Sequence, residues 1–272
     1  MNIVYFGTDV FLDTFCYIAN THNIIALYTY HNDEDYFTEY EIVKEAKKRN
    51  IPIYYEAISV AKIREYFLEQ NCDLFFSAEY NRIIPILEDL LCYKGVNIHS
   101  SFLPIGRSYY PIECAMERNM TRTGVTIHKM VAELDVGAVL LQKEIEIMPY
   151  MDSVDIYLQC GMYARQMTEV LLSDFEQIWN HAIPQTEKCS YWKRTNREKL
   201  TITHEMTIKE TYDIYRRYNH MTEVVIDEKR YYVSSIMTSR IPIFKQEWFL
   251  SQNRCLYQVK DGHLRLNLLE II

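Results

Sequence analysis

The segment MNIVYFGTDVFLDTFCYIANTHNIIALYTY, residues 1–30, decides the fold class. Its two apolar runs, residues 3–6 and 24–30, have the length of buried strands. Between them, residues 10–20 carry apolar side chains at helical spacing, and Gly7-Thr8 marks a turn after the first run. A strand, a helix and a second strand in this order predict a βαβ unit with parallel strands.

The same alternation continues toward residue 100. We expect helices at residues 38–49 and 59–70 and strands at residues 51–54, 74–76 and 95–98. Thr38 and Ser59 are candidate N-caps of the two helices. The pattern predicts an α/β fold with a Rossmann-like, largely parallel sheet and helices on both faces. Ligands bind such sheets at the carboxyl ends of the strands, where Asn97 and His99 fall.

The remaining sequence predicts a second, smaller unit rich in β-structure. Residues 183–206 are polar and irregular, and they separate a long helical stretch with one break from the C-terminal part. Asp261-Gly262 is a hairpin signal between the last two strands. We therefore expect a catalytic domain at 1–190, a linker at 191–206 and a small α+β domain at 207–272. The elements expected in this half are strands at 123–130 and 138–147, a loop at 134–137, helices at 152–181 and 207–218, and strands at 222–227, 230–236, 255–260 and 263–269.

Composition excludes several classes of protein. The formal net charge of −8 and the pI of about 5.5 differ from the basic charge that is typical of nucleic-acid-binding proteins. The chain has seven cysteines, an odd number that cannot all form pairs within the chain. Their spacing matches neither a zinc site nor a disulfide framework. No apolar run reaches the length of a membrane span. We expect a cytoplasmic protein without a metal, and without nucleic-acid or membrane partners.

Two segments resemble the folate-dependent formyltransferases. They are NIHSSFLPIGRSYYP, residues 97–111, and TGVTIHKMVAELDVGAVLLQ, residues 123–142. They match the family's Asn-x-His, its Pro turn, its Thr-Gly-Val-Thr and its Leu-Asp-x-Gly, in order. Asp135 follows His99 by 36 positions, as the corresponding residues do in that family. SAEYNRIIP, residues 77–85, is similar to its pterin-pocket loop, and YWKRTNREKLTI, residues 191–202, to its linker, so the resemblance covers nearly the whole chain.

The resemblance implies transfer of a formyl group from N10-formyltetrahydrofolate to an amine, with Asn97, His99 and Asp135 as catalytic residues. An imidazole titrates near neutral pH and can accept the proton of the amine. The amide of Asn97 can donate a hydrogen bond to the oxyanion of the tetrahedral intermediate. Asp135 can hold the imidazole or a bound water. His128 lies in a β run, and we interpret it as a structural residue.

The resemblance also implies binding residues for the two substrates. Arg82, Ile83, Ile84, Val131 and Asp135 map onto the pterin pocket, where backbone groups commonly make the contacts. Arg107, Tyr109 and Arg194 are candidates for binding the acceptor, with the two arginines pairing with its phosphates. One departure is Ser108, which stands where the family has glycine, so its backbone is expected to avoid conformations reserved for glycine. Tyr109 and Tyr110 replace small residues, and we expect them to narrow the acceptor pocket.

Three acceptors compete within the family. The acidic chain argues against methionyl-tRNA, and a glycinamide ribonucleotide enzyme has no use for the residues after about 200. We favour a nucleotide-linked amino sugar, specifically a dTDP-amino-dideoxyhexose, acted on by a homodimer. A formyl-folate hydrolase using the same three residues and a catalytically silent binding protein remain open.

Overall fold

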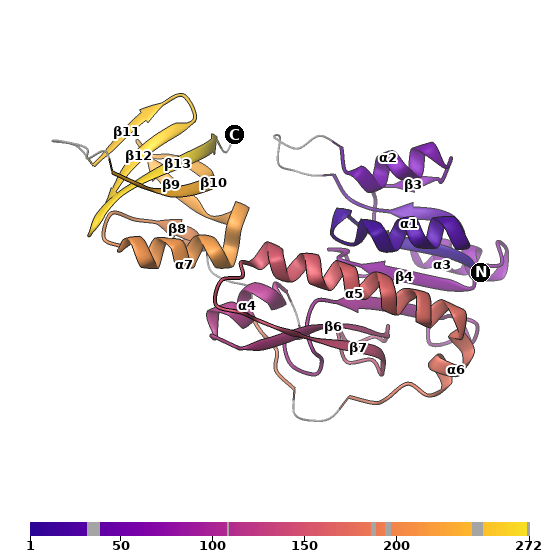
Figure 1. Ribbon diagram of the computed structural model, residues 1–272. Coiled ribbons are helices and arrows are strands. Elements are labelled where there is room, and N and C mark those ends of the chain that lie inside the picture. The colour runs from indigo at the N-terminus through magenta and orange to yellow at the C-terminus, as the bar shows by residue number, and fades with distance from the viewer. Residues whose placement is uncertain (32–38, 108, 186–188, 194–196, 241–246, 271–272) are drawn as a thin grey trace.

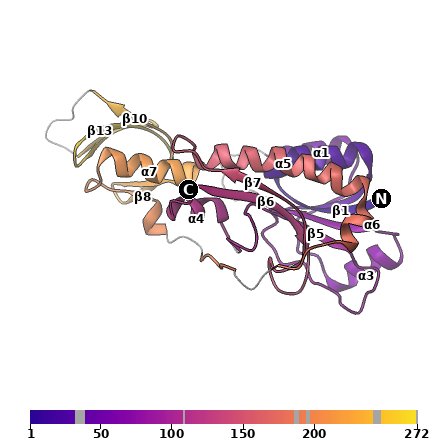
Figure 2. The same cartoon turned by 60° about the horizontal axis from the view of Figure 1, so that its bottom comes forward.

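The computed structural model describes residues 1–31, 39–107, 109–185, 189–193, 197–240 and 247–270. Its strands form two separate sheets, one of seven strands and one of six. Figures 1 and 2 show the six-stranded sheet, with its helix α7, at one end of the larger layered unit. The predicted fold class, a Rossmann-like sheet followed by a small β-rich unit, is confirmed.

The seven-stranded sheet has the order β3-β2-β1-β4-β5-β6-β7. The first five strands in this order run parallel to their neighbours. The last two pair antiparallel, β6 with β5 and β7 with β6. Their bounds are β1 Asn2–Gly7, β2 Asn23–Tyr28, β3 Ile53–Tyr54, β4 Leu74–Ala78, β5 Gly95–His99, β6 Arg122–Lys129 and β7 Val139–Glu146.

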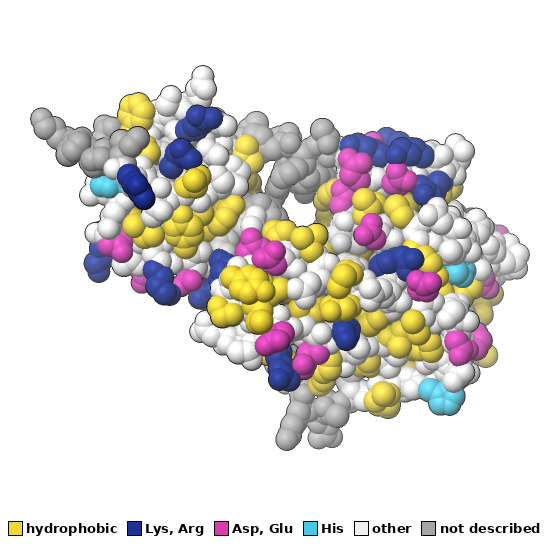
Figure 3. Space-filling model, in the orientation of Figure 1, with side chains coloured by type: hydrophobic (Ala, Val, Ile, Leu, Met, Phe, Trp, Pro, Cys, Tyr) yellow, Lys and Arg dark blue, Asp and Glu magenta, His cyan; other side chains and the backbone are white. Residues whose placement is uncertain are grey.

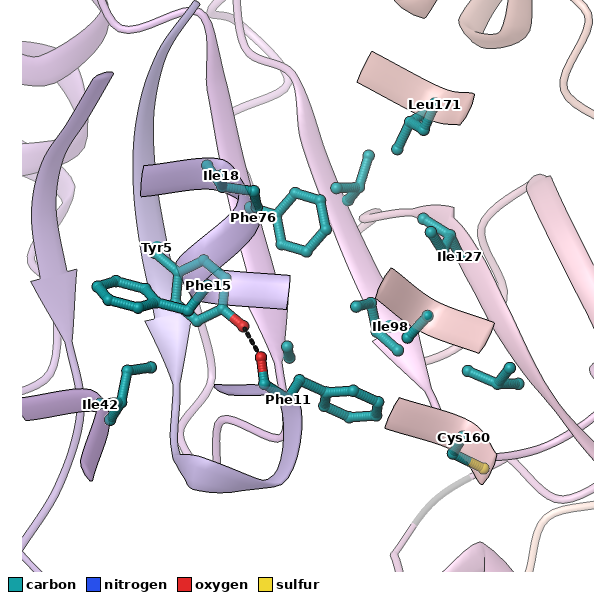
Figure 4. Close-up of a cluster of buried hydrophobic side chains, with 14 of the residues drawn as sticks. Tyr5, Phe11, Phe15, Ile18, Ile42, Phe76, Ile98, Ile127, Cys160 and Leu171 are labelled. Atoms are coloured by element: carbon teal, nitrogen blue, oxygen red, sulfur yellow. Dashed lines mark hydrogen bonds between the residues drawn. The ribbon is translucent and has the colours of Figure 1, made fainter. Parts of the chain in front are cut away.

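Both faces of this sheet are buried, because alternate side chains of β1 enter two different cores. Tyr5 packs in the cluster that α1 (Leu12–Thr21), α2 (Glu41–Lys48) and α5 (Ser153–Ser173) cover. Phe6 packs in the cluster that α3 (Val60–Leu68) covers on the opposite face (Figure 2). The ring of Tyr5 stacks on Phe76 at 5.7 Å between centroids (Figure 4). Burial on both sides explains why these strands are continuous apolar runs.

Two helices differ from the prediction, one in its first residue and one in being present at all. Helix α2 begins at Glu41, and Thr38 lies outside the described residues. The carboxylate of Asp9, in the 3-10 turn η1 (Asp9–Phe11), accepts hydrogen bonds from the backbone N–H groups of Glu41 and Ile42 at 2.9 and 2.8 Å. Helix α4 (Pro111–Glu117) was not predicted, because it is short and its first six residues are all buried, which leaves no amphipathic pattern.

The long helical stretch is broken once, as predicted. Helix α5 ends at Ser173, and a short helix α6 (Phe175–Asn180) follows after Asp174. The start of α5 is fixed by a capping box in which the carboxylate of Asp152 accepts from the backbone N–H of Asp155 at 3.0 Å.

The second sheet has the order β11-β12-β13-β10-β9-β8. Its elements are η2 Arg197–Leu200, β8 Thr201–Ile202, α7 Ile208–Tyr218, η3 Asn219–Met221, β9 Glu223–Ile226, β10 Lys229–Ser239, β11 Trp248–Ser251, β12 Arg254–Val259 and β13 Gly262–Glu270. Strand β8 lies in the predicted linker and β11 was not predicted, because two and four residues give no clear alternation. The hairpin turn was also misplaced by one residue: Val259 pairs with Gly262, so Lys260 and Asp261 form the turn.

Helix α7 joins the second unit to the first. The guanidinium of Arg216 donates to the carbonyl of Met151 at 2.7 Å, and the hydroxyl of Tyr218 hydrogen-bonds with the Glu117 carboxylate. The first contact lies at the start of α5 and the second at the end of α4. Within the described ranges, no helix is both long and apolar enough to cross a membrane.

Candidate active site

A cavity of about 300 Å³ opens at the carboxyl ends of the parallel strands. The register places Gly7 beside Ala78 and Ala78 beside Ile98, so β1, β4 and β5 end together at this edge. The described residues that line the cavity come from the strand ends, the loops after β4 and β6, the segment that leads into α4, and helix α5. They are Tyr30, Ser77, residues 79–84, Ile86, residues 97–99, residues 109–111, His128, residues 130–135 and Tyr157.

Asn97 and His128 face each other across the β5–β6 pair, where they are register partners. Nδ1 of His128 lies 2.9 Å from the carbonyl oxygen of Lys129, so Nδ1 carries the proton and donates it. Nε2 of His128 then accepts from the Asn97 amide nitrogen at 3.2 Å. Burial lowers the pKa of His128 to about 4, although the charge of Asp135 acts in the opposite direction. His128 therefore stays neutral near pH 7 and fixes which way the Asn97 amide points.

His99 ends β5 and is 8% exposed. Its Nε2 lies 2.8 Å from the carbonyl oxygen of Gly106, which can only accept, so this nitrogen donates. In the neutral ring Nδ1 is consequently the basic atom. Oδ1 of Asp135 is 3.8 Å from Nδ1, close enough to stabilise a protonated ring. Gly106 has φ +79, and a Cβ there would lie 2.7 Å from the Trp192 ring, so glycine is required.

Asp135 lies in the loop between β6 and β7 with a left-handed backbone, φ 57. Its Oδ1 is also 3.7 Å from Nε2 of His128, so one carboxylate faces both histidines. The loop closes tightly on β6: a Cβ on Gly137 would lie 1.8 Å from the Lys129 carbonyl oxygen. The structure thus brings Asn97, His99 and Asp135 together at the cavity.

Gln185 holds this loop from outside the cavity. Its side-chain nitrogen donates to the carbonyl oxygens of Asp135 and Gly137, both at 2.8 Å. The guanidinium of Arg107 donates to the side-chain oxygen of Gln185, from Nη2 at 2.7 Å and from Nε at 3.1 Å. Arg107 is 7% exposed, and its guanidinium also lies over the ring of Tyr191. Arg107, predicted to bind the acceptor, is not among the described residues that line the cavity.

The other predicted binding residues divide into two groups. Arg82, Ile83, Ile84, Val131 and Tyr109 all line the cavity. Ile84 is buried, whereas Ile83 and Tyr109 are 71% and 55% exposed and so can be covered by a ligand. Arg194 and Ser108 lie outside the described residues.

Three polar residues of the site were missed or interpreted differently. His128, predicted from the sequence to be a structural residue, contacts the side chain of Asn97 in the site. Glu79 lines the cavity next to His99. Glu113 of α4 is 2% exposed behind it, and burial raises its pKa to about 7 while it accepts from the Tyr157 hydroxyl at 3.3 Å. No sequence motif marks a buried carboxyl group. For Glu79, the one available signal is its position directly after a predicted strand, where ligands bind such sheets.

The fold agrees with the comparison to known proteins. The formyl transferase family model matches residues 22–166, more than half of the chain. The chain therefore belongs to the formyl transferase family.

Individual relatives differ in their names and in coverage. The methionyl-tRNA formyltransferase of Thermotoga maritima is 40% identical over 110 residues, which are 39% of this chain and 34% of that protein. The chain thus spans about a third of the length of this curated relative. HypX from Aquifex aeolicus has a TM-score of 0.74 at 15% identity, over 98% of this chain and 45% of HypX. An N-formyltransferase from Helicobacter canadensis, solved with folinic acid and dTDP-3-aminofucose, has a TM-score of 0.63 at 18% identity over 99% of each chain.

The lowered pKa of His128 makes a prediction about stability and pH. The unfolded ring titrates near 6.5 and the folded ring near 4, so the unfolded state binds more protons as the pH falls between these values. This group alone should lower the unfolding free energy by roughly 2 kcal/mol between pH 7 and pH 5. Urea unfolding at both pH values should show a smaller fall for His128→Gln. His181→Gln, at an exposed histidine, should behave as wild type. An equal fall in wild type and His128→Gln would contradict the assignment.

Proposed function

We propose that this chain transfers the formyl group of N10-formyltetrahydrofolate to the amine of a nucleotide-linked amino sugar. The observation that carries the proposal is the convergence of Asn97, His99 and Asp135 on one cavity at the carboxyl end of β5. Membership of the formyl transferase family supports the same chemistry.

We assign to each of the three residues a role that its contacts support. The amine nitrogen bonds to the formyl carbon, and Nδ1 of His99 accepts the proton that the nitrogen loses. Asn97 gives one N–H to His128, so its second N–H donates to the oxyanion. Asp135 stabilises the imidazolium formed on His99. As the intermediate collapses, the bond to N10 of the folate breaks and His99 returns the proton to that nitrogen.

The folate donor fits the wall formed by the loops after β4 and β6. Ile84 and Val131 give this wall an apolar surface for the pterin ring, and the neighbouring backbone can match its amide-like edge. Arg82 is the single basic Lys or Arg side chain among the described residues that line the cavity. Its guanidinium can form ion pairs with the carboxylates of the folate tail.

Two observations bear on the acceptor. The likeness to the Helicobacter canadensis enzyme extends over 99% of each chain, and that protein was solved with a dTDP-linked amino sugar. On the face in Figure 3, basic side chains are interspersed with acidic ones, unlike the single-sign surface that a tRNA favours. Methionyl-tRNA is the second candidate acceptor, because the Thermotoga maritima relative carries that name.

The first prediction of the proposed function concerns the catalytic residues. His99→Ala and Asp135→Ala should each lower kcat by at least about 100-fold, because the proton acceptor or its counter-charge is lost. Calorimetric binding of folinic acid should stay near the wild-type value, since neither change removes the apolar wall. His181→Ala is the matched control at an exposed histidine. Near-normal kcat in both variants would refute the assignment.

The second prediction concerns the acceptor. With N10-formyltetrahydrofolate as donor, dTDP-3-aminofucose should be formylated faster than glycinamide ribonucleotide or methionyl-tRNA. Formate release without any amine should be slow. Faster transfer to methionyl-tRNA would establish the second candidate, and equal turnover without an amine would identify a formyl-folate hydrolase.

The third prediction concerns Gln185. Gln185→Ala removes both hydrogen bonds to the loop of Asp135, so the carboxylate should lose its fixed distance to His99. We expect kcat to fall about 10- to 100-fold with little change in the KM of either substrate. Gln177→Ala, at an exposed glutamine of α6, is the control. An unchanged kcat, or a change confined to KM, would show that the hydrogen bonds from Gln185 to the Asp135 loop do not affect catalysis.

A further inference from the structure

Glu79 occupies a position at the cavity that the roles of Asn97, His99 and Asp135 do not explain. It follows β4 directly, and the register pairs Ala78 with Ile98, so Glu79 and His99 are the next residues on neighbouring strands. On the other side Ala78 pairs with Gly7. Glu79 thus lies at the centre of the edge where β1, β4 and β5 end.

The backbone and one hydrogen bond hold the carboxylate there. Glu79 has a left-handed backbone, φ 54, which a residue other than glycine adopts only at some cost in energy. The Ser100 hydroxyl donates to its Oε1 at 3.1 Å. A carboxylate has about four acceptor positions, so this one bond leaves capacity for a ligand's donors.

We propose that Glu79 binds the acceptor amine in its ammonium form and takes the first proton from it. The inference rests on the proposed function, because it concerns the amine that this function formylates. Amines of this kind are largely protonated near neutral pH and cannot attack a formyl carbon until one N–H bond breaks. The proton passes to a Glu79 oxygen, and the nitrogen keeps the electron pair with which it attacks.

The remaining protons balance without another reagent. The second N–H proton goes to His99 and then to N10 of the folate, the third stays on the formamide, and Glu79 releases its proton to water. Two different groups thereby serve the two deprotonations, so His99 stays unprotonated until the amine attacks. Glu79 and His99 both line the cavity, so an ammonium group bound there can reach both side chains.

The electrostatics of the pocket suit this role. Burial raises the pKa of the Glu79 carboxyl, and the charge of Asp135 adds to the rise, whereas a cationic His99 and the Ser100 bond lower it. A carboxyl with a raised pKa is a better proton acceptor than an ordinary one. The titratable groups that act on Glu79, or on which it acts, are His99 of β5, Asp135, Glu113 of α4, Tyr157 and Cys160 of α5, and Tyr30.

The test uses Glu79→Gln, which keeps the size and the Ser100 contact but loses the charge. Acceptors are dTDP-3-aminofucose, methionyl-tRNA and glycinamide ribonucleotide, and the one that wild type formylates fastest is used. We expect kcat/KM for that acceptor to fall about 10- to 100-fold, with the KM for N10-formyltetrahydrofolate almost unchanged. The loss should be larger toward neutral pH and smaller at high pH, where the free amine is already neutral. The control is Glu88→Gln, at an exposed glutamate that is not part of the cavity lining, and it should keep wild-type kinetics.

The outcomes separate the two hypotheses. If wild type transfers formyl to none of the three amines, the proposed function fails and this inference fails with it. If wild type formylates the amino sugar but Glu79→Gln matches it at every pH, the proposed function stands and the role of Glu79 is refuted. If methionyl-tRNA or glycinamide ribonucleotide is the fastest acceptor, the sugar assignment fails, and the same comparison on that amine still decides the role of Glu79. A loss of equal size at all pH values, or one shared by Glu88→Gln, would also refute it, because a structural defect does not depend on the charge of the amine.

Discussion

The antiparallel pairing of β6 with β5 is the contact on which the site depends. It adds two strands to a parallel sheet and reverses the chain beside the strand that carries Asn97 and His99. The register sets Asn97 against His128, and it brings the loop after β6 back to the carboxyl edge of β5. A slip of one residue would turn every side chain of β6 to the opposite face, so the site and the sheet core are specified together.

The loop itself is held by short-range constraints. Gly137 allows the chain to approach the Lys129 carbonyl closely. Gln185, about fifty residues further along the chain, donates hydrogen bonds to two carbonyl oxygens of the loop. Arg107 orients Gln185 from the segment that follows β5. Asp135 is therefore positioned by both its own loop and the segment after α6. Such over-determination is what keeps a carboxylate at a fixed distance from an imidazole.

The parts of this design that could be predicted are those with a repeating signal. The apolar runs of β1, β2 and β4 follow from burial on both sheet faces, and the capping box at Asp152 is local in sequence. Other contacts join residues that are far apart in the sequence, so no local pattern predicts them. The carboxylate of Asp9 accepts from the first backbone N–H groups of α2, more than thirty residues further along the chain. Helix α4 is buried on all sides over its first six residues, so its sequence lacks the 3.6-residue period of an amphipathic helix. His128 looked structural because a polar residue in a strand gives no hint of its register partner. The motif segments located Asn97, His99 and Asp135, but not the contacts that orient them.

The charges around the cavity constrain how an anionic acceptor would enter. The described lining residues include one arginine, Arg82, and three carboxyls, those of Glu79, Glu133 and Asp135. A diphosphate inside such a cavity would be repelled, whereas an ammonium would be attracted. The guanidinium of Arg107 is bonded to Gln185 and braces the Asp135 loop. For a nucleotide sugar, these charges favour entry with the amine leading and the diphosphate at the mouth. The Tyr109 ring, exposed at the cavity wall, would then meet the uncharged part of the acceptor between them.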